Sequence, residues 1–316
     1  MANKPRISRK ALDIGNKIAA DAVARRKKAH KTRNAALAKA RKRITRTVAT
    51  SGAKAMIAKD TVTHQSAGVL IAEGDSWFDY PFHDVLSDLE DLYAFDVESV
   101  AHHGDSVEEM AYSGGQLDDF SRRVEKTLRT GVKPRAILLS GGGNDVAGDE
   151  FAVLLNHARS SISGLNESVV DGIIQERVRD AYVTILAAIT QICKSQIGST
   201  VPIIIHGYDY PVPDGRGFLG GFGPLPGPWL EPGFRDKGYS DMNVRKGICK
   251  DLIDRFNEML AKLAGQPPFS HVRYLDLRET LSTGPKFKAD WANELHPTGE
   301  GFKKVTAKFA ALIQTL

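Results

Sequence analysis

A serine, a histidine and several N–H donors stand at positions where they could carry out acyl transfer. Ser76 ends a Gly-Asp-Ser segment, and a serine held on a tight turn after a strand can attack a carbonyl carbon. The attack needs a base that takes the hydroxyl proton, and His296 is the candidate. It also needs N–H donors aimed at the developing oxyanion. Gly104, the side-chain amide of Asn144 and the Ser76 N–H itself could supply them.

Each of these features alone is weak evidence for an active site. Gly-Asp-Ser is typical of ordinary turns, and a single histidine is more often a capping or surface residue than a base. The three glycines at 141–143 could form a phosphate loop, but no Lys-Ser/Thr pair follows them. Their shared location is the stronger signal, because all of them follow the ends of predicted strands.

The elements that must position these residues alternate from residue 68 onward. Short β-branched and apolar runs predict five strands: Gly68–Ala72, Phe95–Ala101, Arg135–Ser140, Val201–His206 and Val272–Leu277. Helices are predicted between and after them: Asp84–Tyr93, Leu117–Thr130, Gly172–Ser195, Ser240–Ala264 and Gly301–Leu316. This alternation predicts an α/β fold with a parallel sheet buried on both faces. In such sheets the ligand site lies beyond the carboxyl ends of the strands, where the polar residues are found.

Four short blocks within residues 68–316 resemble the GDSL family of serine esterases and lipases, also called SGNH hydrolases. The resemblance implies that Ser76 is the nucleophile and His296 the base, and that Gly104 and Asn144 complete an oxyanion hole with the Ser76 amide. It also implies a three-layer α/β/α sandwich with a five-stranded parallel sheet. The matching blocks are Gly74-Asp75-Ser76, Gly104, Gly142-Gly143-Asn144-Asp145 and His296-Pro297.

One position departs from the family pattern. Where the family has an aspartate three residues before the histidine, this chain has Asn293. An amide oxygen can still accept from the imidazole N–H and orient the ring, although it brings no full negative charge. Asp290 and Glu294 are the nearby carboxylates. We expect Asn293 to orient His296, with Asp290 and then Glu294 as the alternatives.

Residues 211–234 contain seven Gly and six Pro, which predicts a long irregular loop beside the fourth predicted strand. Loops of this length are often lids or binding loops, and the alternative is a tolerated surface insertion. Aromatic side chains in and near the loop could form an apolar wall for an acyl chain, or could simply pack in the core. They are Phe218, Phe222, Trp229 and Phe234, with Trp77 and Phe78 beside the nucleophile.

The N-terminal part of the chain differs strongly in charge from the rest. Residues 1–60 hold 18 Lys and Arg against three Asp, a net charge of +15, whereas the remaining residues carry −10. We therefore predict a basic arm (1–66) and a hydrolase domain (67–316), with Ala-rich helical sequence over 8–48. A weak apolar stripe recurs along it at Ala11, Ile14, Ile18 and Ala22.

Four interpretations of the basic arm follow from its charge. It could bind an anionic membrane surface, bind nucleic acid, dock on the acidic remainder of the chain and stabilise it, or be a solvated, partly disordered extension. No aromatic residue for base stacking precedes Trp77, which makes nucleic acid the less favoured partner.

Several classes of protein are excluded or disfavoured by composition. No apolar run reaches the length of a membrane-spanning helix, and no secretory signal is recognisable, so a cytoplasmic protein is expected. Cys193 and Cys249 are too few for a disulfide framework or a thiolate metal site. No metal or other cofactor is predicted, because the remaining candidate ligands match no metal-binding spacing: His102, His103, Asp105 and His206.

The sequence thus predicts a serine esterase or lipase that cleaves a lipid or acylated-carbohydrate ester. Two alternatives remain open: a carbohydrate or peptidoglycan O-deacetylase, and a non-catalytic binding module with a degenerate triad. The acyl chain length and the oligomeric state are left undetermined.

Overall fold

The computed structural model describes residues 7–21, 23–24, 28, 66–113, 115–220 and 225–316. Their centre is a parallel five-stranded sheet in the order β2-β1-β3-β6-β7. The predicted strands and the α/β/α architecture are confirmed; β1 is shifted by one residue from its predicted range, and the other four strands are shorter than predicted. The strands are β1 (Val69–Glu73), β2 (Asp96–Ser99), β3 (Ala136–Leu139), β6 (Ile203–His206) and β7 (Val272–Leu275).

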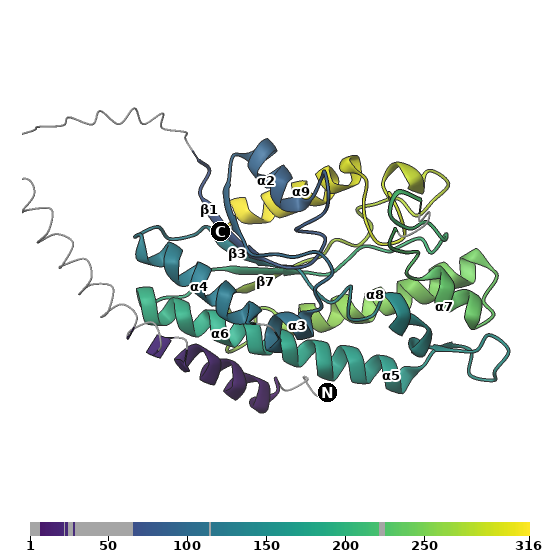
Figure 1. The fold of residues 1–316 in the computed structure, drawn as a ribbon, viewed down its shortest axis with the longest axis horizontal. Coiled ribbons are helices and arrows are strands. Elements are labelled where there is room, and N and C mark those ends of the chain that lie inside the picture. Colours follow the sequence, from purple (N-terminus) through teal and green to yellow (C-terminus); the bar gives the residue numbers. More distant parts are fainter. Residues whose placement is uncertain (1–6, 22, 25–27, 29–65, 114, 221–224) are drawn as a thin grey trace, which may run out of the picture.

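Helices cover both faces of the sheet (Figure 1). On one face α2 (Val85–Tyr93) packs against α9 (Gly299–Gln314). The other face carries α3, α4, α6 and α8, with α6 packed against both α3 and α4. The central strands β3 and β6 are buried along their whole length, which explains their continuous apolar sequence. The bounds on this second face are α3 (Val107–Tyr112), α4 (Gln116–Arg129), α6 (Arg179–Ile197) and α8 (Met242–Leu263).

The sequence did not predict several short elements. A π-helical segment, Gly172–Val178, runs directly into α6, so the single helix expected from residue 172 has two parts. Helix α7 (Glu231–Asp236) begins inside the segment 211–234, where no regular element was expected. Its proline lies in the first helical turn, where a missing N–H costs nothing. The other short elements are η1 (Gly148–Leu154), β4 (Leu155–Asn156), β5 (Gly164–Leu165), α5 (Glu167–Asp171), η3 (Phe218–Gly220) and η4 (Phe287–Ala289).

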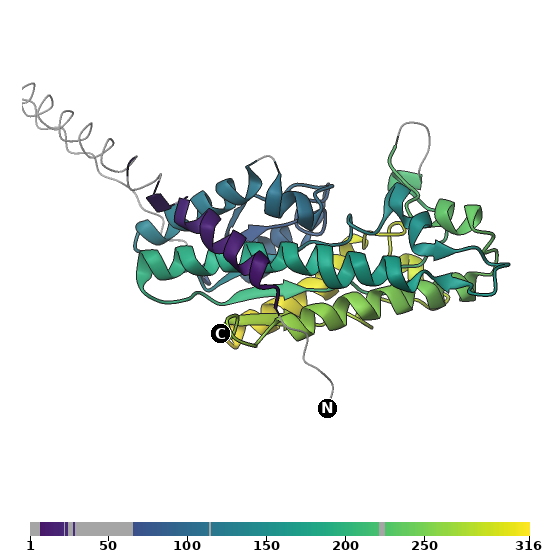
Figure 2. The ribbon, with the colours of Figure 1, turned by 90° about the horizontal axis from the view of Figure 1, so that it is seen from below.

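Residues 9–21 form a helix that lies along α6 (Figure 2). Its buried line consists of small residues, Ala11, Gly15 and Ala19, and a Cβ at Gly15 would collide with the backbone of Thr184 on α6. The small side chains therefore allow close helix contact. The isoleucines of the predicted stripe lie beside this line and are only partly buried.

The described start of the basic arm is therefore docked on the body of the protein. Most of the remaining predicted arm helix, including Ala22 and the Lys and Arg residues within 25–43 other than Lys28, lies outside the described residues. Among the helices of the described residues, none is long and apolar enough to cross a membrane.

Candidate active site

Ser76 lies on a single tight turn directly after β1. The backbone N–H groups of Phe78 and Asp79 both donate to the Asp75 carbonyl, at 3.0 and 3.1 Å, which closes the turn. A Cβ on Gly74 would lie 2.7 Å from Ser140 Cβ, so only glycine fits where β1 passes the end of β3. The turn leaves Ser76 partly accessible while its neighbours are buried.

The buried carboxylate of Asp75 holds this turn in place through hydrogen bonds. It is 2% exposed and accepts hydrogen bonds from Ser140 Oγ at 2.7 Å and from the Trp77 backbone N–H at 3.0 Å. The Tyr208 hydroxyl donates to its other oxygen. Three donors from three segments therefore satisfy this buried acid, which makes Asp75 a structural support of the nucleophile turn.

His296 reaches the serine from the loop that precedes α9. Its Nε2 lies 2.7 Å from Ser76 Oγ, although 220 residues separate the two in sequence. Its Nδ1 lies 3.0 Å from Asn293 Oδ1. The amide oxygen can only accept, so Nδ1 carries the proton and Nε2 is free to accept the serine hydroxyl. This is the tautomer that a general base requires.

The orientation of the Asn293 amide is fixed from both ends. Its Oδ1 also accepts from the backbone N–H groups of Leu295 and His296, at 3.0 and 2.8 Å. Its Nδ2 donates to the Tyr80 hydroxyl at 3.1 Å. A flipped amide would direct N–H groups at N–H groups, so the network admits one orientation only. Asn293 is 1% exposed, which shields these bonds from water.

Tyr80 also stacks on the catalytic candidate. Its ring lies nearly parallel to the His296 imidazole, with centroids 4.2 Å apart and an interplanar angle of 16°. Trp229 meets the same imidazole edge-on at 5.5 Å. Burial among these rings lowers the pKa of His296 to about 3, because no carboxylate compensates for lost hydration of the imidazolium. The histidine is therefore neutral at physiological pH.

The two carboxylates weighed against Asn293 have other partners. Asp290 accepts from the Ser282 N–H at 2.8 Å and from Lys304 Nζ at 2.7 Å. Burial alone would raise the pKa of Asp290, but Lys304 and the Ser282 N–H lower it overall. Asn293 is thus the residue that the structure brings to His296.

Glu294 anchors the Gly- and Pro-rich loop. Its fully buried carboxylate accepts from four backbone N–H groups of segment 211–234, at distances between 2.7 and 3.1 Å. Burial raises the pKa of Glu294, and the four N–H groups oppose that shift. Arg216 adds two bonds to the backbone carbonyls of Trp291 and Ala292, at 2.9 and 2.8 Å. The loop is therefore pinned to the segment that carries the histidine. The four donors are Gly215, Trp229, Leu230 and Glu231.

Three groups can still donate an N–H to a ligand. Two of them are backbone N–H groups with no acceptor among the described residues, and the third is a side-chain amide with one hydrogen unused. Neither the Ser76 N–H nor the Gly104 N–H donates to any described group. Gly104 has a φ of +89°, a backbone conformation that glycine adopts readily, and a Cβ added there would meet no atom within 4 Å. Asn144 Nδ2 uses one hydrogen to donate to the Asp105 carbonyl at 2.9 Å, which leaves the other.

Asp145, the last residue of the third block, supports the Gly104 loop indirectly. Its carboxylate accepts from the N–H groups of Val107 and Glu108, at 2.8 and 3.4 Å, at the first turn of α3. Burial raises its pKa to about 6. The block thus ties the end of β3 to the helix that follows Gly104.

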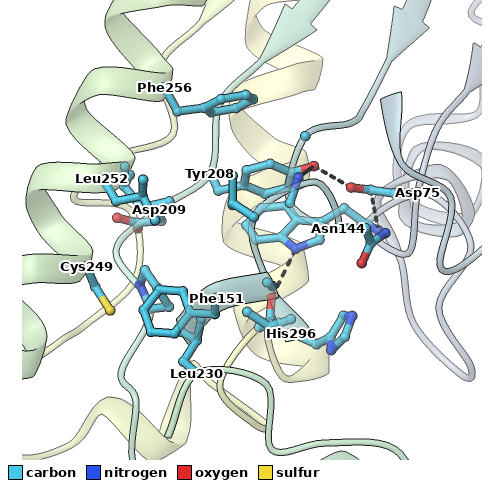
Figure 3. A pocket seen from close by; sticks show the side chains of 18 of the residues that line it. Asp75, Asn144, Phe151, Tyr208, Asp209, Leu230, Cys249, Leu252, Phe256 and His296 are labelled. Carbon is cyan, nitrogen blue, oxygen red and sulfur yellow. Dashed lines mark hydrogen bonds between the residues drawn. The ribbon is translucent and has the colours of Figure 1, made fainter. Parts of the chain in front are cut away.

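A cavity of about 70 Å³ opens beside the nucleophile (Figure 3). Asn144 and His296 lie on one side, and Cys249, Leu252 and Phe256 of helix α8 lie on the opposite side. Ser76 and Ile253 also line the cavity. None of these α8 residues was predicted to line the site, because their apolar pattern is that of any packed helix.

The aromatic wall expected from segment 211–234 is only partly found. Trp229 contacts His296 and Phe218 contacts Tyr80, but neither lines the cavity. Phe234, in α7, is fully buried against Phe151 of η1. Phe222 lies outside the described residues. The nearby Trp77 does line the cavity, whereas Phe78 is buried in the core against Phe309.

The polar residues weighed as metal ligands are dispersed. His103 Nδ1 lies 3.1 Å from Asp79, whereas His206 is buried in the core and its pKa is lowered by that burial. Asp105 accepts from Gln116, and His102 is exposed. No cluster of three potential ligands occurs within the described part of the chain.

Comparison with known proteins places the site in context. A scan against protein-family profiles and a search of curated proteins by sequence each returned no match. Among solved structures, a protein from Slackia heliotrinireducens described as an SGNH hydrolase is 13% identical, with a TM-score of 0.43, covering 78% of this chain and 98% of that one. An extracellular lipase from Streptomyces rimosus is 15% identical, with a TM-score of 0.46, covering 78% and 99%.

An acetyl xylan esterase from Geobacillus stearothermophilus is likewise 15% identical, with a TM-score of 0.34, covering 78% of this chain and 95% of that one. The description of the Slackia protein names the family that the four sequence blocks resemble. With TM-scores below 0.5 and identities of 13–15%, these similarities carry no argument about this chain, so its function is argued below from the site itself.

Proposed function

We propose that this protein is a serine hydrolase that cleaves a carboxylic ester through an acyl-enzyme on Ser76. The observation that carries the proposal is the contact of 2.7 Å between Ser76 Oγ and His296 Nε2, in the tautomer set by Asn293. A nucleophile, a base and a group that orients the base are the parts that such catalysis requires.

The reaction would run in two halves. His296 Nε2 takes the hydroxyl proton as Ser76 Oγ bonds to the carbonyl carbon, and the carbonyl oxygen becomes an oxyanion. The N–H groups of Ser76, Gly104 and Asn144 would stabilise that charge. The imidazolium then gives its proton to the leaving alcohol oxygen as the C–O bond breaks. A water molecule, deprotonated by His296, releases the acid and restores Ser76.

The alternative of a non-catalytic binding module is less well supported. A degenerate site has no need to hold a partly accessible serine 2.7 Å from a neutral imidazole whose tautomer is fixed for proton transfer. An O-deacetylase remains a specific form of the same chemistry, and the small volume of the cavity beside Ser76 favours the short acyl group of that reaction.

The experiment is stoichiometric labelling with an organophosphonate ester, read by intact-protein mass spectrometry. Wild-type protein should gain one adduct on Ser76, and Ser76→Ala should gain none while keeping its melting temperature. Ser160→Ala, a change at an exposed serine far along the chain, should label like wild type. Ester hydrolysis by Ser76→Ala at the wild-type rate would refute the assignment.

A further inference from the structure

The cavity beside Ser76 is lined mainly by apolar side chains. Opposite the catalytic candidates stand Cys249, Leu252 and Phe256 of α8 (Figure 3). The lining is completed by Phe151 of η1 and by Leu230 of the loop that Glu294 anchors. An acyl chain attached to Ser76 would meet hydrocarbon on most sides of this cavity.

Apart from the catalytic candidates Ser76, Asn144 and His296, most polar side chains that line the cavity are hydrogen-bonded within the protein. Asp209 accepts from the N–H groups of Tyr210, Glu279 and Leu281, at 2.7, 2.8 and 2.6 Å. Asp75 and Tyr208 bond to each other. The indole N–H of Trp291 has no partner among described residues, but it is buried and does not face open space. Sugar hydroxyl groups in this cavity would find few partners, whereas methylene groups would need none.

The volume limits how much hydrocarbon the cavity can hold. A dry protein cavity of about 150 Å³ accommodates the six carbons of benzene. The cavity here has about 70 Å³, roughly half of that. It therefore has room for about two to four carbon atoms at ordinary packing density.

The backbone segments that form the cavity walls are held in place, so the cavity cannot enlarge easily. Leu230 stands on the loop that Glu294 anchors, and its own backbone N–H is one of the four donors, at 2.7 Å. On the other side α8 is capped at its start by Asp241 and is buried along its inner face. A longer chain would have to displace anchored backbone, which is costly.

From these observations we propose that the protein is selective for esters of short apolar acids, with about two to four acyl carbons, and that Leu252 and Cys249 set the upper limit. The proposal rests on the proposed function, since it concerns the acyl group that Ser76 would receive. It makes the acid side of the ester short and apolar and leaves the alcohol side, which lies outside this cavity, free to be large.

The test is hydrolysis of p-nitrophenyl esters with two, three, four, six and eight acyl carbons. The wild-type kcat/KM should rise about fourfold for each methylene that is buried in the cavity. Beyond the limit it should fall, because one methylene that a pocket cannot hold changes kcat/KM by roughly 10–200-fold. A wild-type enzyme that prefers eight carbons to four would overturn the proposal.

Two variants move the limit in opposite directions. Leu252→Ala removes three carbon atoms from the wall, so the ratio of kcat/KM for six against four carbons should increase at least tenfold. Cys249→Leu adds atoms to the same wall, so the ratio for four against two carbons should fall. Ile253→Ala replaces the first variant if Leu252→Ala does not fold, because Ile253 lines the same wall.

Leu260→Ala is the matched control. Leu260 is fully buried on α8 but does not line the cavity, so this variant should lower the melting temperature and keep the wild-type chain-length profile. An equal shift of profile in Leu260→Ala, or no shift in the cavity variants, would overturn the proposal. If no ester is hydrolysed and phosphonate does not label Ser76, the proposed function itself fails. If phosphonate labels Ser76 but the enzyme prefers long-chain esters, only the proposed limit on the acyl chain is refuted.

Discussion

Tyr80 should contribute to catalysis because its ring lies on the imidazole that must become charged. In a serine hydrolase with an aspartate beside the histidine, a carboxylate stabilises the imidazolium of the transition state. Here the neutral Asn293 stands in that position, and the face of Tyr80 lies 4.2 Å from the His296 ring centre. The negative face of an aromatic ring attracts a cation, so the attraction appears when the imidazole takes the serine proton.

The size of this effect follows from the burial of the pair. His296 is only 6% exposed, so the interaction is largely desolvated and worth about 2 kcal/mol. Because 1.36 kcal/mol corresponds to a factor of ten in rate, Tyr80→Leu should lower kcat by roughly 30-fold. The KM should change little, since the charge exists only in the transition state.

Tyr80→Phe separates the ring from its hydroxyl group. The phenylalanine keeps the stacked ring and loses only the acceptor for Asn293 Nδ2, a bond of 3.1 Å. We expect kcat to fall by less than tenfold, in line with the modest net value of one neutral hydrogen bond. A Phe variant as slow as the Leu variant would show that the hydroxyl group, and not the ring, matters. A Leu variant with wild-type kcat would refute the reasoning altogether.

The pH profile supplies a readout that a loss of folding would not imitate. His296 must be neutral to act as base, so activity rises with pH through its pKa. With that pKa lowered to about 3 by burial, kcat should stay nearly constant from pH 8 down to about pH 4. Asn293→Asp supplies a negative charge that favours the imidazolium, so its acid limb should move to higher pH. The buried acids Glu294, held by four N–H groups, and Asp75, held by its three donors, are both unchanged in this variant.

Four further predictions follow. Asn144→Ala should lower kcat by roughly 10²–10³-fold with little change in KM, measured with a soluble ester, since the oxyanion donor acts on the transition state; a change confined to KM would mean that it binds substrate instead. Asn293→Ala should lower kcat strongly, whereas Asp290→Ala should lower the melting temperature and leave kcat within a few-fold; the opposite result would make Asp290 the group that orients the histidine. The buried Glu73 has its pKa raised from 4.5 to about 9, mainly by burial. The wild type should therefore lose stability as pH rises from about 4.5 to 9, about 3 kcal/mol of it by pH 7, and Glu73→Gln should unfold at higher urea than wild type at pH 8 but not at pH 4.5. Replacing the Lys and Arg residues within 25–43 by Gln should weaken co-sedimentation with anionic vesicles by about 1 kcal/mol per charge at low salt and leave ester hydrolysis unchanged; unchanged vesicle binding would remove the membrane hypothesis.

The sheet and its long helices could be predicted because their signal is local. The core of a predicted strand such as Ala136–Leu139 is apolar throughout, and burial on both faces is what selects such runs. Short elements such as α3 and α7 escaped prediction because six residues are too few to show a helical period. Segment 211–234 looked irregular by composition alone, yet the proline of α7 occupies the one helical turn that tolerates it.

The site was predictable to the extent that its residues follow strands directly. Ser76, Gly104 and Asn144 each lie just beyond a strand end, where parallel sheets bring loops together. The partnership of Tyr80 with Asn293 joins positions 213 residues apart, and no pattern in the sequence marks it. The apolar cavity side was missed for the same reason, since the inner face of α8 looks like ordinary core until the fold places it opposite Ser76.

The structural role of Glu294 explains why position 293 carries an amide and not a carboxylate. Glu294 is buried without contact to water, and its carboxylate is committed to four N–H groups of the loop that walls the cavity. An aspartate at 293 would set a second buried negative charge on the adjacent residue, and like charges in a shared low-dielectric environment are costly. The chain therefore uses one carboxylate to fix the cavity wall and an amide to orient His296. The ring of Tyr80 then lies where the missing charge would have stabilised the imidazolium.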